Sequence, residues 1–142
     1  MTRSERPARV LVITDHSEAT PEVLEAVRKR AAQGPAVFKI LVPNPARAEA
    51  HVRHLERHEK AEAAEQVLHD ALPAFRDAAG APVLGSVSIR HDPFDAIEET
   101  LQDEPIDEFI VALVPHGLSR MLHQDLAHRL AHFGLPVTSV TA

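Results

Sequence analysis

The chain contains no cysteine, no tryptophan and no tyrosine, and only five of its 142 residues are glycine. The absence of cysteine excludes disulfides, thiolate nucleophiles and thiolate zinc sites. The absence of Trp and Tyr leaves few rings on which bases could stack, and a formal net charge of −6 disfavours contact with phosphate backbones. We therefore expect no nucleic-acid partner.

Long apolar runs are also missing. No run approaches the roughly 18 residues of a membrane-spanning helix, and the first residues lack the apolar region of a secretory signal. We expect a soluble cytoplasmic protein that has no membrane partner. A length of 142 residues with 44% apolar side chains is typical of one domain with a sizeable core, so we expect a single domain over residues 1–142.

Apolar, β-branched runs alternate along the chain with segments of helical spacing. The runs are residues 9–14, 37–42, 83–90, 108–114 and 135–140. This alternation predicts an α/β fold in three layers, with a five-stranded parallel sheet and helices on both faces. The run 108–114 is the most apolar, so we expect it to lie centrally in the sheet. Pro136 predicts that the last run begins there or lies at an edge.

Local signals set the bounds of the helices. Thr20 is a predicted N-cap with Pro21 at the first helical position, and Asp92 and Pro93 repeat this pattern. The basic run Arg28, Lys29 and Arg30 comes near the end of the first helix, where cations interact favourably with the helix dipole. A long charged helix is predicted over residues 46–79, with an apolar stripe formed by Val67, Leu68, Leu72 and Phe75.

The polar loops that follow the first and fourth strands, with Val42 at the end of the second strand, are the candidates for a ligand site. In parallel open sheets, such loops meet at the carboxyl edge, and ligands bind where the strand order reverses. The first loop offers a carboxylate, an imidazole and a hydroxyl, and the fourth opens a helix whose free N–H groups attract anions. The candidate ligand-binding residues are Asp15, His16, Ser17, Val42, His116, Gly117, Ser119 and Arg120.

Purely structural roles for the residues of these loops remain open. Asp15 and Ser17 are residue types that favour turns and helix caps wherever they occur. Ser119 can be a cap alone, and Arg120 a solvated surface residue. A glycine-rich phosphate loop and a nucleophile elbow are both absent from the sequence.

Ten histidines suggest metal binding or acid–base chemistry. His51, His54 and His58 share one face of a helix, as do His128 and His132, and imidazoles at such spacings bind zinc or nickel. Histidines that face solvent among Glu and Arg are more common, so we assign no metal site and no catalytic residue. His16, His91 and His116 all follow predicted strands, which leaves a small hydrolase as an alternative function.

Several fragments together resemble the universal stress proteins, within the superfamily of adenine-nucleotide alpha-hydrolase-like folds. Residues 10–18 are similar to the family's first strand and its Asp-x-Ser-Glu loop, and residues 91–97 to its acidic turn before a helix. Residues 107–111, 117–120 and 135–137 resemble later signatures in the same order. The resemblance implies the strand order 3-2-1-4-5 and an adenine-side contact by Asp15. It also implies a homodimer formed through the fifth strand, at Val137, Ser139, Val140 and Thr141.

The chain departs from the family at the phosphate motif. Nucleotide-binding members carry Gly, two residues, Gly, nine residues, and then Gly with Ser or Thr. Here Val114, Pro115 and His116 occupy the first position, and Gln124 and Asp125 the last. We therefore expect a non-catalytic stress-response regulatory domain with a degenerate nucleotide site and no bound cofactor such as ATP or AMP. The alternative is binding of a mononucleotide or small anion in the crevice between the first and fourth strands.

Overall fold

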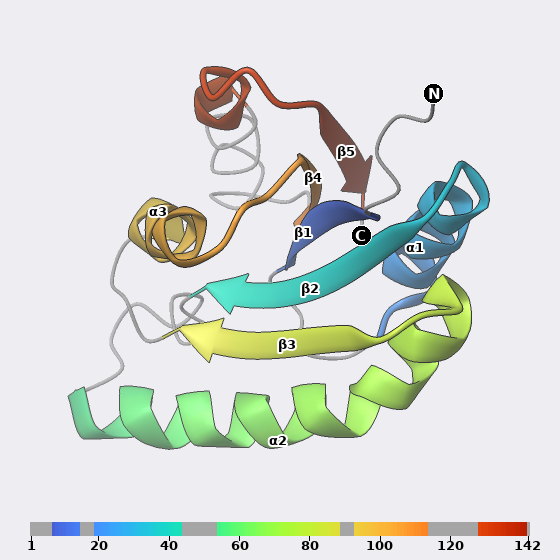
Figure 1. Cartoon of the computed structure of the whole chain (residues 1–142). Coiled ribbons are helices and arrows are strands. Elements are labelled where there is room, and N and C mark those ends of the chain that lie inside the picture. The colour runs from blue at the N-terminus through green and yellow to red at the C-terminus, as the bar shows by residue number, and fades with distance from the viewer. Residues whose placement is uncertain (1–6, 15–18, 44–53, 89–92, 114–127, 142) are drawn as a thin grey trace.

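The computed structural model describes residues 7–14, 19–43, 54–88, 93–113 and 128–141. In this part of the chain, five parallel strands form one sheet in the order β3-β2-β1-β4-β5 (Figure 1). The strands are β1 (Ala8–Thr14), β2 (Ala36–Pro43), β3 (Val83–Ser88), β4 (Glu108–Leu113) and β5 (Val137–Thr141). The α/β class and the strand order implied by the resemblance are both confirmed.

Helices cover both faces of this sheet. Helices α1 (Pro21–Ala32) and α2 (His54–Ala79) lie on one face, and α3 (Pro93–Asp103) lies on the other with the helical residues 128–131 (Figure 1). Among the described residues, no helix is long and apolar enough to cross a membrane.

The two cores follow from the alternation of side chains along each strand. Val10 and Val12 of β1 face α1 and α2, whereas Leu11 and Ile13 face α3, and all four are almost completely buried. Strands that are apolar on both faces are expected where a parallel sheet carries helices on both sides. β1 occupies the middle of the sheet, and β2 and β4 are the interior strands on either side of it.

The predicted bounds of α1 are confirmed. Helix α1 begins at Pro21, and the Thr20 hydroxyl accepts a hydrogen bond from the Val23 N–H at 3.4 Å. The helix ends two residues before Gly34, as the Gly-Pro stop predicts. Helix α3 likewise begins at Pro93. Asp92 lies outside the described residues.

The prediction for α2 is partly wrong. Leu68, Leu72 and Phe75 are buried, but Val67 is 42% exposed and does not belong to the buried stripe. The described helix begins at His54, and residues 46–53 lie outside the described part of the chain. Pro73 lies inside the helix, where its ring removes one backbone donor.

Candidate functional site

The strand order places the two predicted loops at neighbouring strand ends. Thr14, the last residue of β1, is in register with Ala112 of β4, and both side chains are fully buried. The chain leaves β1 toward α1 on one face, whereas after β4 it returns to the sheet through residues 128–131 on the other face. This is a topological switch point, the place where ligands bind in open α/β sheets.

Most of the predicted ligand-binding residues come directly after these two strand ends. Asp15, His16 and Ser17 follow β1, and His116, Gly117, Ser119 and Arg120 follow β4. All seven lie outside the described residues, as does His91 of the hydrolase alternative. The structure therefore positions the strands from which both loops start, and those strands are hydrogen-bonded neighbours.

Val42 is the one predicted ligand-binding residue that the structure describes. It lies near the carboxyl end of β2, in register with Val87 of β3. Its side chain is fully buried in the core beneath α1 and α2. Val42 thus packs in the core next to the carboxyl ends of the strands. A contact between its side chain and a ligand stays a prediction.

Charged groups at the opposite, amino ends of β1 and β4 form structural contacts. The backbone N–H of Arg9 donates to Asp107 Oδ2 at 2.8 Å, and the Asp107 N–H donates to the Arg9 carbonyl at 2.8 Å. Arg30, at the end of α1, forms a partly buried ion pair with Glu108, the first residue of β4. This pair gives Arg30 a role in attaching α1 to the sheet.

A further partly buried ion pair lies on the α3 face of the sheet. The Lys39 ammonium of β2 lies 2.6 Å from a carboxylate oxygen of Glu104, which follows α3. The Arg9 guanidinium lies 3.9 Å from the same carboxylate. Arg9, Arg30 and Lys39 therefore each have a carboxylate partner, and these cations act in the packing of helices on the sheet rather than in a cationic surface.

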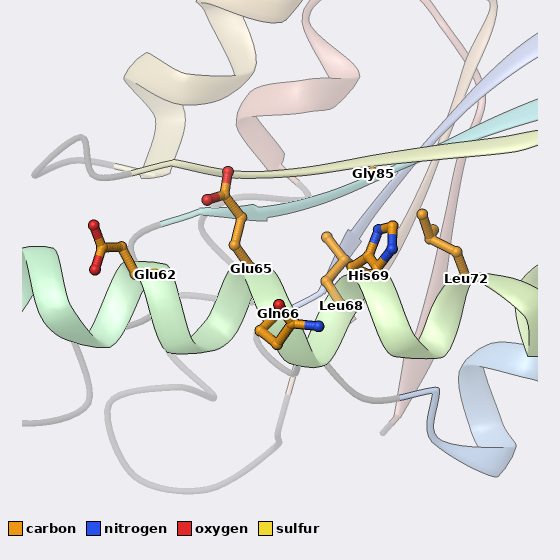
Figure 2. A pocket seen from close by; sticks show the side chains of 7 residues that line it. All are labelled: Glu62, Glu65, Gln66, Leu68, His69, Leu72 and Gly85. Carbon is orange, nitrogen blue, oxygen red and sulfur yellow. The ribbon is translucent and has the colours of Figure 1, made fainter.

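The structure also shows a groove that the sequence analysis missed. It lies between α2 and the edge strand β3 and has a volume of about 350 Å³. Glu65, Leu68 and His69 rise from α2 on the side that faces β3 (Figure 2). The lining residues are Glu62, Glu65, Gln66, Leu68, His69, Leu72 and Gly85.

The floor of this groove depends on Gly85. A Cβ built on Gly85 would lie 2.9 Å from Leu68 Cδ2 and 3.3 Å from Leu72 Cδ2, so the glycine lets α2 approach the strand closely. The sequence signal for this close packing was Gly85 itself, because a glycine inside a predicted strand often marks the close approach of another segment.

Among the side chains that the structure describes, no group of three or more His, Cys, Asp or Glu could hold a metal ion. We interpret the groove as a result of packing.

Comparison with known proteins adds no relative: no family model matches the chain, and no curated protein matches it. The resemblance to universal stress proteins therefore rests on the sequence fragments described above. The strand order that it implies is the part that the structure shows independently.

Proposed function

We propose that this chain is a non-catalytic, universal-stress-like regulatory domain with a degenerate nucleotide site at the carboxyl ends of β1 and β4. The observation that supports the proposal is the order of the strands: β1 and β4 are parallel neighbours whose following segments cross to opposite faces. Side chains that follow such strands converge on one crevice. Asp15, after β1, is the residue that the resemblance assigns to the adenine side.

The sequence after β4 is unfavourable for a triphosphate. Pro115 lacks the N–H that a glycine would offer to a phosphate oxygen. Asp125 stands near the position where family members place Gly with Ser or Thr, and a carboxylate repels a polyphosphate by roughly 1 kcal/mol or more at surface-like dielectric. The site thus keeps features of the adenine side and lacks the triphosphate cradle.

Titration of the purified chain with ATP, ADP and AMP in a calorimeter tests this proposal. We expect ATP to bind no more tightly than AMP, because the groups that would contact the second and third phosphates are absent. Micromolar affinity for ATP would contradict a degenerate site.

Binding of a mononucleotide or small anion is the second candidate. In the sequence, Gly117, Ser119 and Arg120 follow β4, and the helix start predicted there would attract a single phosphate together with the Arg120 guanidinium. Arg120→Ala should then lower the affinity for AMP or inorganic phosphate about tenfold, a loss of about 1.4 kcal/mol. Arg28→Ala is the matched control, because Arg28 is exposed on α1 and pairs with Glu25. Equal affinities in both variants would remove this candidate.

A homodimer through β5 belongs to the same proposal. β5 is an edge strand of the sheet, and the side chains of Thr138 and Ser139 are exposed. An exposed edge offers free backbone groups to a second strand. The resemblance implies that the partner is a second copy of this chain. The proposal places this homodimer in the cytoplasm, with a role in a stress response.

A further inference from the structure

Two histidines meet on the surface just before β5. His128 and His132 are four residues apart, and their rings contact edge to face with centroids 5.3 Å apart and planes at 89°. Both side chains are exposed. His128 belongs to the helical residues 128–131 and His132 begins the turn that follows them, so one short turn of backbone brings the two rings together.

The backbone beneath the two rings is held in place. Leu130, between the histidines, is fully buried against the core on the α3 face. The ring of Phe133 packs against Phe109 of β4 with centroids 6.2 Å apart. The His132 N–H donates to the Arg129 carbonyl at 3.1 Å, and the Gly134 N–H to the Ala131 carbonyl at 3.1 Å. The two imidazoles are therefore presented from a fixed turn.

The distance between the two ring centres is close to that of two imidazoles on one metal ion. In a tetrahedral zinc site, each ligating nitrogen lies about 2.0 Å from the ion, which places each ring centre about 3.2 Å away and two ring centres about 5.2 Å apart. The observed separation is 5.3 Å. In the observed edge-to-face contact the ring planes are at 89°, so metal binding requires both rings to turn about their Cβ–Cγ bonds, a soft torsion for histidine, until one nitrogen of each faces the ion.

We propose that His128 and His132 form a two-imidazole site for a divalent first-row cation such as Zn²⁺, Ni²⁺ or Cu²⁺, with water in the other coordination positions. Neutral imidazole suits these ions, whereas Mg²⁺ and Ca²⁺ require oxygen ligands. Two protein ligands leave the ion exchangeable, and Cu²⁺ should bind most tightly, in line with the usual order of divalent metals.

The test is a calorimetric titration of the full chain, without an affinity tag, with NiCl₂ and ZnCl₂. His128→Ala and His132→Ala should each lower the affinity at least tenfold. The double variant should lose no more than either single variant, because chelation requires both rings. His69→Ala, at an exposed histidine on α2, is the matched control and should leave the affinity unchanged.

Nitrogen NMR of the imidazoles locates the ion during the zinc titration. The nitrogens of His128 and His132 should shift first and together as Zn²⁺ is added. The proposal is overturned if other imidazoles are saturated with Zn²⁺ before these two, or if the single variants bind the metal as tightly as the unmodified chain. Circular dichroism of each variant identifies any that fails to fold, and for such a variant the NMR titration of the unmodified chain decides.

Discussion

At the scale of single residues, Gly85 controls how α2 packs on the edge of the sheet. It lies in β3, in register with Ile40 of β2, and its missing side chain leaves room for Leu68 and Leu72. Both leucines belong to the core between the sheet and α2. Glycine weakens a strand through its backbone freedom, so its presence here is explained by close packing.

Gly85→Ala should destabilise the fold by about 1 kcal/mol, because the new methyl group overlaps the Leu68 side chain and the cost of moving that side chain exceeds the backbone entropy gained by replacing glycine. Urea denaturation measures the change in the free energy of unfolding. The control is the same substitution in a Leu68→Ala background, where the overlap is relieved and the added cost should be smaller. Equal costs in both backgrounds would show that the overlap is not the cause.

At the scale of secondary-structure elements, α1 shows how local signals set a helix. Thr20 has an extended backbone, its hydroxyl accepts from the Val23 N–H, and Pro21 occupies the first helical position. Val23 and Val27 face the sheet, and Arg30 in the last turn pairs with Glu108. Each of these features lies within a few residues of sequence except the last, which joins the helix to β4.

Thr20→Ala should lower the free energy of unfolding by about 0.5–1 kcal/mol, because the Val23 N–H loses its acceptor. The hydrogen bond is long at 3.4 Å, which places the expected loss toward the lower end of the range for caps. Thermal or urea unfolding measures it. Thr20→Asp keeps an acceptor and adds a favourable charge at the helix N-terminus, so it should retain stability; a loss equal to that of Thr20→Ala would contradict the cap.

Sequence spacing predicted the buried face of α2 less well than it predicted α1. Leu68, Leu72 and Phe75 follow a helical period and are buried, but Val67, one residue before Leu68, is displaced by about 100° around the helix axis. The sequence marks Val67 as apolar without showing on which side of the helix the core lies. That depends on how α2 packs on its neighbours, which is a property of the tertiary structure.

At the scale of the whole molecule, the open edge of β5 determines how two copies could pair. The Pro136 carbonyl accepts from the Phe109 N–H, so the backbone groups of residues 136, 138 and 140 face β4. Successive residues of a strand point their N–H and C=O groups to opposite sides. Val137 and Ser139 therefore present theirs to the open edge.

Ser139→Pro should disrupt a β5-mediated dimer while changing the stability of the monomer by less than about 1 kcal/mol, because the lost N–H faces away from β4. Light scattering coupled to size-exclusion chromatography measures the mass. Thr138→Pro is the matched control: it removes an N–H that faces β4 and should reduce stability more. If Ser139→Pro remains dimeric, the pairing surface lies elsewhere, and if the unmodified chain is a monomer at high micromolar concentration, the homodimer is ruled out.

The sequence by itself determined the α/β class, the bounds of most described elements and the cap of α1, because hydrophobic period, caps and glycine or proline stops are local properties. It also marked which residues follow β1 and β4. The neighbours β1 and β4 and the edge strands β3 and β5 were expected only from the family resemblance, and the tertiary structure confirmed them; the close approach of α2 to Gly85 was decided by the tertiary structure alone. These facts depend on contacts between segments far apart in the chain, and no local period carries that information.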